Sequence, residues 1–137
     1  MSSRRTWTDL ATDAAQMMLS SAASDADVRR QIDVAKKYPV ETGGGVCIRF
    51  AGIPAELALK ERGRRVVTGD VIGVLCGTDD VLMFSLFVDG GFVRFLDIST
   101  TAGAMPSSCE RVTLVRRVVR RGGGSGAGEK GAGSVRR

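Results

Sequence analysis

The stretch Ile72–Leu86 constrains the fold more than any other part of this chain. Two apolar runs are separated there by Gly77–Asp80, which reads Gly-Thr-Asp-Asp. This order predicts a strand, a tight acidic turn and a returning strand. Gly73 lies inside the first run, where a residue without a Cβ atom allows a strand to bend sharply. The stretch therefore predicts a strongly bent antiparallel barrel with short strands.

The rest of the chain supplies further strands with glycine-rich turns between them. The turn Asp89-Gly90-Gly91 is typical of a β-hairpin. Closing a small sheet into a barrel removes exposed edges, which favours a barrel over an open sheet for five short strands. The expected strands are 46–50, 66–76, 81–88, 92–98 and 112–119.

Two helices are expected before the first strand. Residues 6–20 have apolar side chains at helical spacing, and Thr6 with Asp9 predicts a capping box. A second helix is expected over 25–37 and should end before Pro39, because the residue preceding a proline avoids the helical region. We divide the chain into a helical extension, a barrel domain with an insertion at 51–65, and a disordered basic Gly/Arg tail: 1–24, 25–119 and 120–137.

Composition narrows the function classes. The chain has 137 residues, 43% of them apolar and 26% charged, which are ordinary values for one globular domain. No apolar run approaches the roughly 20 residues of a membrane span, and we expect an intracellular protein. The absence of histidine removes the commonest general base and most zinc sites. We therefore expect no enzyme, no metal and no cofactor, and interpret Cys47, Cys76 and Cys109 as small buried apolar residues.

The positive charge is concentrated at the C-terminus. The chain has a net charge of +5, whereas residues 116–137 carry seven basic residues and one acid and are therefore +6. This leaves residues 1–115 at −1. A basic tail on a nearly neutral body suggests a polyanionic partner, with nucleic acid as the leading case; a solvated tail that only aids solubility is the alternative.

The same residues resemble the Sm and Sm-like (LSm) proteins. Ile72–Leu86 is similar to the first Sm motif, especially in subunits with a Gly-x-Asp-Asp turn, and Gly73 falls on the bend glycine of that family. Phe95–Ile98 and Val112–Val115 look like the fourth and fifth Sm strands. The resemblance spans roughly 25–119 and implies an N-terminal helix followed by a bent five-stranded barrel.

The resemblance also implies an RNA-binding pocket, which is degraded here. Asp79 keeps the expected residue type, but Val81 replaces the residue that stacks on a base and Met83 replaces the asparagine that bonds its edge. Arg111 offers a replacement cation next to the position of the family's Arg-Gly pair. Together with the tail, the candidate RNA-binding residues are Asp79, Val81, Met83, Arg111, Arg120 and Arg121.

Sm-type proteins assemble into rings, usually of seven subunits, by pairing the fourth strand of one subunit with the fifth strand of the next. The resemblance therefore implies other Sm-like subunits as partners and an RNA, U-rich or a small nuclear RNA, in pre-mRNA splicing or mRNA decay in the nucleus or cytoplasm. Neither a membrane nor a small-molecule substrate is expected. The ring-interface residues would be Phe92, Arg94, Leu96, Val112 and Leu114.

Two other interpretations remain open. A small barrel of OB or SH3-like type in a ribosomal or other ribonucleoprotein particle fits the basic tail and the N-terminal helices equally well. A protein–protein module without RNA fits the nearly neutral body and the missing aromatic platform.

Overall fold

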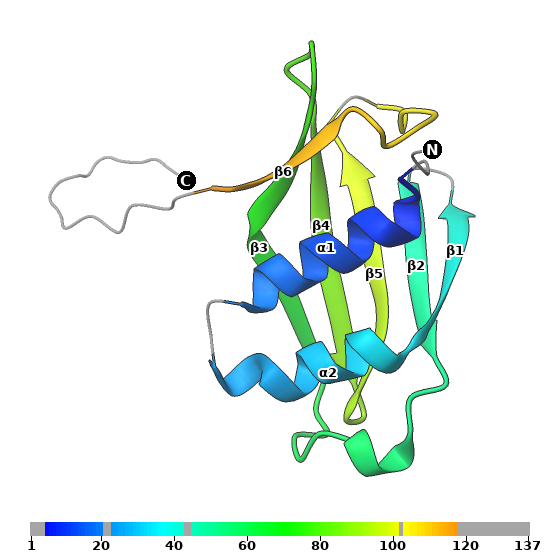
Figure 1. Cartoon of the computed structure of the whole chain (residues 1–137), viewed down its shortest axis with the longest axis vertical. Coiled ribbons are helices and arrows are strands. Elements are labelled where there is room, and N and C mark those ends of the chain that lie inside the picture. The colour runs from blue at the N-terminus through cyan, green and yellow to red at the C-terminus, as the bar shows by residue number, and fades with distance from the viewer. Residues whose placement is uncertain (1–4, 21–22, 43–44, 102, 118–137) are drawn as a thin grey trace, which may run out of the picture.

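The computed structural model describes residues 5–20, 23–42, 45–101 and 103–117. These residues form two layers, in which two α-helices lie across one face of a six-stranded antiparallel sheet (Figure 1). The predicted class, N-terminal helices followed by an antiparallel β-structure, is therefore confirmed. The hydrophobic core lies between the layers; its fully buried members include Leu10 and Ile32 from the helices and Ile48, Leu86 and Leu96 from the sheet.

The first helix, α1 (Trp7–Leu19), begins at the predicted capping box. The Asp9 amide donates to Thr6 Oγ1 at 3.0 Å, and the Thr6 amide donates to Asp9 Oδ2 at 3.1 Å. These bonds satisfy amide groups that have no partner inside the helix. Leu10, Ala14 and Leu19 of α1 belong to the same core as the sheet, so the helix forms one layer of the folded unit.

The second helix, α2 (Ala26–Val34), follows a short 3-10 turn, η1 (Ala23–Asp25), and is shorter than the predicted 25–37. The prediction was wrong at the C-terminal end because Lys36–Thr42 forms a strand, β1, that pairs with the next strand along the chain. Pro39 is tolerated in β1 because the strand lies at the edge of the sheet.

The sheet is not a closed five-stranded barrel, which corrects the predicted architecture. Its strand order is β1-β2-β5-β4-β3-β6, with every neighbouring pair antiparallel. The strand predicted to be first therefore pairs with β1 and β5, and β1 and β6 end the sheet on opposite sides. The other strands are β2 (Gly45–Ala51), β3 (Arg65–Leu75), β4 (Val81–Asp89), β5 (Phe92–Thr100) and β6 (Val112–Arg116).

Gly73 has a packing role and not the predicted role of bending a barrel. The register of β3 against β4 shifts between Thr68 and Ile72, before Gly73 is reached. A Cβ atom on Gly73 would lie 2.7 Å from Val112 Cγ1 and 3.3 Å from Leu82 Cβ. Only glycine therefore fits between these two buried side chains without moving them.

The predicted insertion at 51–65 is held to the domain through Gln31 of α2. It contains a short 3-10 turn, η2 (Ala55–Leu57). The Gln31 side chain is fully buried and donates through Nε2 to the carbonyl oxygens of Leu57 at 2.8 Å and Gly91 at 2.9 Å. Its Oε1 accepts from the Val93 amide at 2.8 Å. One side chain thus joins the helical layer, the loop and the β4–β5 hairpin.

Arg116 fixes the last strand to the helical layer. Its Nη1 donates to Asp70 Oδ2 at 2.6 Å, and its Nη2 donates to Ser20 Oγ at 3.0 Å and to the Met17 carbonyl oxygen. The guanidinium therefore supplies a positive charge at the C-terminal end of α1, whose last turn contains no basic residue. Residues 120–137, the predicted disordered tail, lie outside the described residues.

Candidate functional site

The face of the sheet opposite the helices is built from residues that face one another across the strands. Directly opposed residues in an antiparallel sheet project their side chains to the same face. Three rows of such residues run from one edge of the sheet toward the other, and we call this surface the open face. The rows are Tyr38, Arg49, Phe95, Phe87 and Val66; Val40, Cys47, Asp97, Ser85 and Thr68; and Thr42, Gly45, Ser99, Met83, Ile72 and Val115.

The open face carries most of the exposed apolar bulk of the described chain. Within the described ranges, six large apolar side chains are classed as exposed, and five of them belong to this face. Their exposed fractions are Tyr38 50%, Val40 42%, Val66 47%, Met83 44% and Val115 40%. Both helices lie on the other side of the sheet (Figure 1). Exposed apolar patches of this kind mark interaction surfaces.

An aromatic pair lies near the middle of the open face. The rings of Phe87 and Phe95 are stacked, with their centroids 4.4 Å apart and an interplanar angle of 22°. Both rings are partly buried and cover part of each other. The pair therefore gives the centre of the face a fixed apolar surface.

Arg49 and Asp97 are the charged members of the three rows. Neither side chain forms a hydrogen bond or an ion pair with another residue in the described part of the chain. Both lie close to Cys47: burial and then the Asp97 carboxylate raise the pKa of that thiol, and the Arg49 guanidinium opposes the shift. The open face thus presents one unpaired cation and one unpaired anion within an apolar surround.

The structure brings together only part of the predicted RNA-binding pocket. Asp79 lies in the exposed turn between β3 and β4, and Val81 begins β4. Arg111 lies in the turn before β6 at the same end of the sheet, where its carbonyl accepts from the Cys76 amide at 3.1 Å. Met83 belongs to the open face. Arg120 and Arg121 lie outside the described residues.

The predicted ring-interface residues fall on two differently placed strands. Phe92, Arg94 and Leu96 belong to β5, which is paired with β2 on one side and β4 on the other. The expected ring strand 92–98 therefore has no free edge in the described structure. Val112 and Leu114 belong to β6, which pairs with β3 and ends the sheet.

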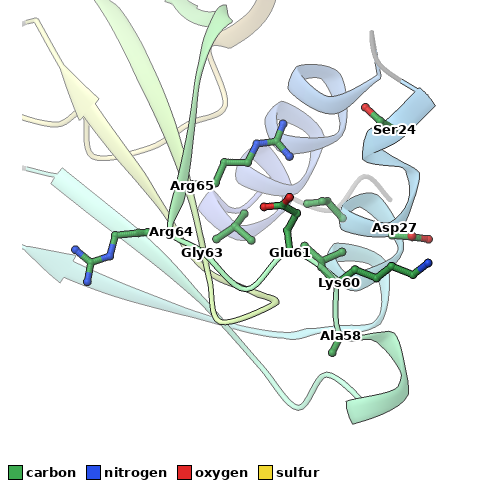
Figure 2. A pocket seen from close by; sticks show the side chains of 11 residues that line it. Ser24, Asp27, Ala58, Lys60, Glu61, Gly63, Arg64 and Arg65 are labelled. Atoms are coloured by element: carbon green, nitrogen blue, oxygen red, sulfur yellow. The ribbon is translucent and has the colours of Figure 1, made fainter.

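A cleft at the opposite end of the sheet is a weaker candidate. It has a volume of about 510 Å³ and lies between the start of α2 and the loop that carries η2. Figure 2 shows Ser24 and Asp27 on the helix side, Lys60 and Glu61 on the loop side and Arg65 at the start of β3. Arg65 donates to Asp25 at 3.0 Å, and the remaining charges are of both signs. The cleft therefore favours no ligand class.

The described residues contain no cluster of three or more histidine, cysteine or carboxylate side chains able to hold a metal ion. The cysteines differ in exposure: Cys76 is exposed, Cys47 is partly buried and Cys109 is buried. Burial raises the pKa of the Cys109 thiol, whose Sγ donates to the Arg5 carbonyl at 3.3 Å. The interpretation of all three as buried residues is therefore wrong for Cys76.

Sequence reasoning missed the open face, although one signal pointed to it. The β4 sequence Val-Leu-Met-Phe-Ser-Leu-Phe-Val is apolar at nearly every position, not only at alternate ones. A strand that is apolar on both sides needs cover on both sides. We expected a closed barrel to bury these apolar side chains, whereas the structure buries only the side of β4 that faces the helices.

None of the helices in the described part of the chain is long and apolar enough to cross a membrane. No protein family model, no curated protein and no solved structure matches this chain.

Proposed function

We propose that this chain is a non-catalytic interaction module that docks a protein partner on its open face. The observation that supports the proposal is the set of five exposed apolar side chains around the Phe87–Phe95 pair. An apolar centre with few charges is the composition of protein–protein interface cores.

A protein suits this face better than a nucleic acid. Bases stack on exposed aromatic rings, and phosphates require several cations. Here the two phenylalanines stack on each other, and Arg49 is the one cation in the three rows, with Asp97 on the neighbouring strand. The face therefore offers apolar contact and little that is specific to RNA.

Two valines with nearly equal exposure lie on opposite sides of the molecule. Val66 on the open face is 47% exposed and Val34 on α2 is 50% exposed. Val66→Lys should reduce the recovery of docked proteins about tenfold or more, because it places a charge in an apolar interface. The measurement is cross-linking of the tagged full chain in its source cells, followed by quantitative mass spectrometry.

Val34→Lys is the matched control and should leave the recovered set unchanged. Met83→Lys, at the third row of the open face, should repeat the effect of Val66→Lys. If the Val66 and Met83 variants keep the same partners at the same yield as the control, the open face is not the docking surface and the proposal is wrong.

A second candidate function is binding of RNA through the C-terminal segment. The observation that favours it is the charge of +6 on residues 116–137, compared with −1 on the rest of the chain. Phosphate contacts by such a segment give affinity without sequence readout. In an Sm-like ring, the expected ring strand β5 would pair with a neighbouring subunit and would therefore have to lose β2 or β4 as its partner. The proposal is therefore RNA binding by this chain without such a ring.

RNA binding should become less sensitive to salt when the C-terminal segment is removed. Removing residues 120–137 takes away five basic residues, Arg120, Arg121, Lys130, Arg136 and Arg137. For a single strand, each lost phosphate contact makes the negative slope of log K against log salt less steep by about 0.7. Fluorescence anisotropy with an oligouridine at several salt concentrations measures the slope. An unchanged slope would place the RNA contact on the folded body instead.

A further inference from the structure

The arrangement of charge on the open face identifies a specific partner. Four residues of β2 and β5 form a square, in which Cys47 lies opposite Asp97 and Arg49 lies opposite Phe95. Arg49 and Asp97 therefore occupy one diagonal of the square, and Cys47 and Phe95 occupy the other. The first diagonal thus carries one cation and one anion, which attract each other when they are brought together.

A half-turn about an axis that lies parallel to the sheet, just above the face and along the Cys47–Phe95 diagonal, exchanges the two ends of the other diagonal. A second copy placed on the face by that rotation puts its Asp97 over Arg49 and its Arg49 over Asp97. Cys47 and Phe95, which lie on the axis, then face the same residues of the second copy. Isologous interfaces require this self-complementarity of one patch with itself.

We infer that the open face binds a second copy of this chain in a twofold, face-to-face dimer with two symmetric Arg49–Asp97 ion pairs. The inference rests on the proposed function and names the partner of the same face. Two sheets packed in this way lie about 10 Å apart, with interdigitated side chains between them. The Phe87–Phe95 pair and the exposed side chains of Tyr38 and Val40, which lie on β1 next to the square, would then be covered.

The size of the face sets the expected strength. A six-stranded sheet with strands about 4.8 Å apart, counted over about six residues of 3.4 Å rise, presents roughly 500 Å². The square lies between the second and third strands, so two copies overlap over only part of this area, and the interface stays below the roughly 1,000 Å² of specific, stable complexes. The dimer should therefore dissociate in the micromolar range, and its detection requires a concentration series.

The test is sedimentation velocity of the full chain from about 1 to about 300 µM. The unmodified chain should shift from monomer to dimer. Arg49→Asp leaves two like charges facing each other at both ends of the diagonal, as does Asp97→Arg, so each variant alone should raise the dissociation constant about 100-fold or more.

An equimolar mixture of the Arg49→Asp and Asp97→Arg chains should recover the dimer as a heterodimer, because each aspartate then faces an arginine. The double variant with both changes in one chain should recover the homodimer. These two recoveries also show that the single variants are folded. A partner of different sequence on this face predicts no recovery in either case.

A chain that stays monomeric over the whole range, or a dimer that ignores the charge reversals, would overturn the inference. The proposed function has a separate readout, since loss of cross-linked partners in Val66→Lys can occur with a monomeric chain. A monomer whose other partners depend on Val66 leaves the docking proposal standing and removes only the self-association. A monomer whose partners are indifferent to Val66 removes both.

Discussion

Gln31→Leu is expected to destabilise the protein by about 3 kcal/mol or more. The substitution removes the hydrogen bonds of three buried backbone groups, the carbonyl oxygens of Leu57 and Gly91 and the amide of Val93. Each buried polar group left without a partner costs about 1–3 kcal/mol. Thermal unfolding followed by circular dichroism should show a midpoint lower by about 10 °C.

Gln16→Leu is the control, because Gln16 bonds Arg29 and Asp33 on the exposed side of the helices. Its effect should stay below about 1 kcal/mol, as for most surface substitutions. A Gln31→Leu protein that melts with the unmodified chain would show that the three backbone groups find other partners, and that Gln31 does not hold the loop to the sheet.

Gly73→Val is the second substitution with a large expected effect. The added Cβ atom would lie 2.7 Å from Val112 Cγ1 and 3.3 Å from Leu82 Cβ, so that β3 or its neighbours must shift. Overpacking of a filled core costs about 1–3 kcal/mol, and we expect the upper part of that range because both neighbours are buried. Urea unfolding measures the loss.

Gly63→Val provides the matched comparison, because a Cβ atom on Gly63 meets no atom within 4 Å. This variant should unfold at nearly the same urea concentration as the unmodified chain. Adding Val112→Ala to Gly73→Val should recover part of the lost stability by making room for the new side chain. A Gly73→Val protein with an unchanged free energy of unfolding would show that this glycine has no such packing role.

Local signals predicted the local structure well. The capping box at Thr6 and Asp9 fixed the start of α1, and the turns at Gly77 and Gly90, both with positive φ, separate β3 from β4 and β4 from β5 as expected. Each of these features is decided by residues within a few positions of one another, so a reading of the chain alone is sufficient for them.

Features set by distant residues were not predicted. Lys36 and Lys37 fall inside the helix predicted over 25–37, but pairing with Ala51 and Phe50 makes them the start of β1. The alternation of β2 shows that it has a buried side, but not that β5 is its neighbour in place of β3. The closed barrel was wrong for this reason, since a barrel requires the two end strands of the sheet to pair, and β1 and β6 do not pair in the described structure.

The open face was missed for a related reason. From the sequence alone, an apolar residue such as Met83 or Val66 is expected to lie in the core, because apolar side chains favour burial. The sequence does not show whether such a side chain is buried by its own chain or by a partner. Arg49 and Asp97 gave no signal, since their relation depends on the pairing of β2 with β5.

Both edges of the sheet carry features that hinder pairing with a further strand. At β1, Pro39 removes one backbone donor from the edge, and the exposed Lys36 adds a charge. Both are common ways in which natural edge strands avoid pairing with other chains. At β6, only five residues are available and Arg116 ties the strand back to α1. A protein with one exposed apolar face and two protected edge strands can form a dimer through that face without adding further copies edge to edge into a fibril.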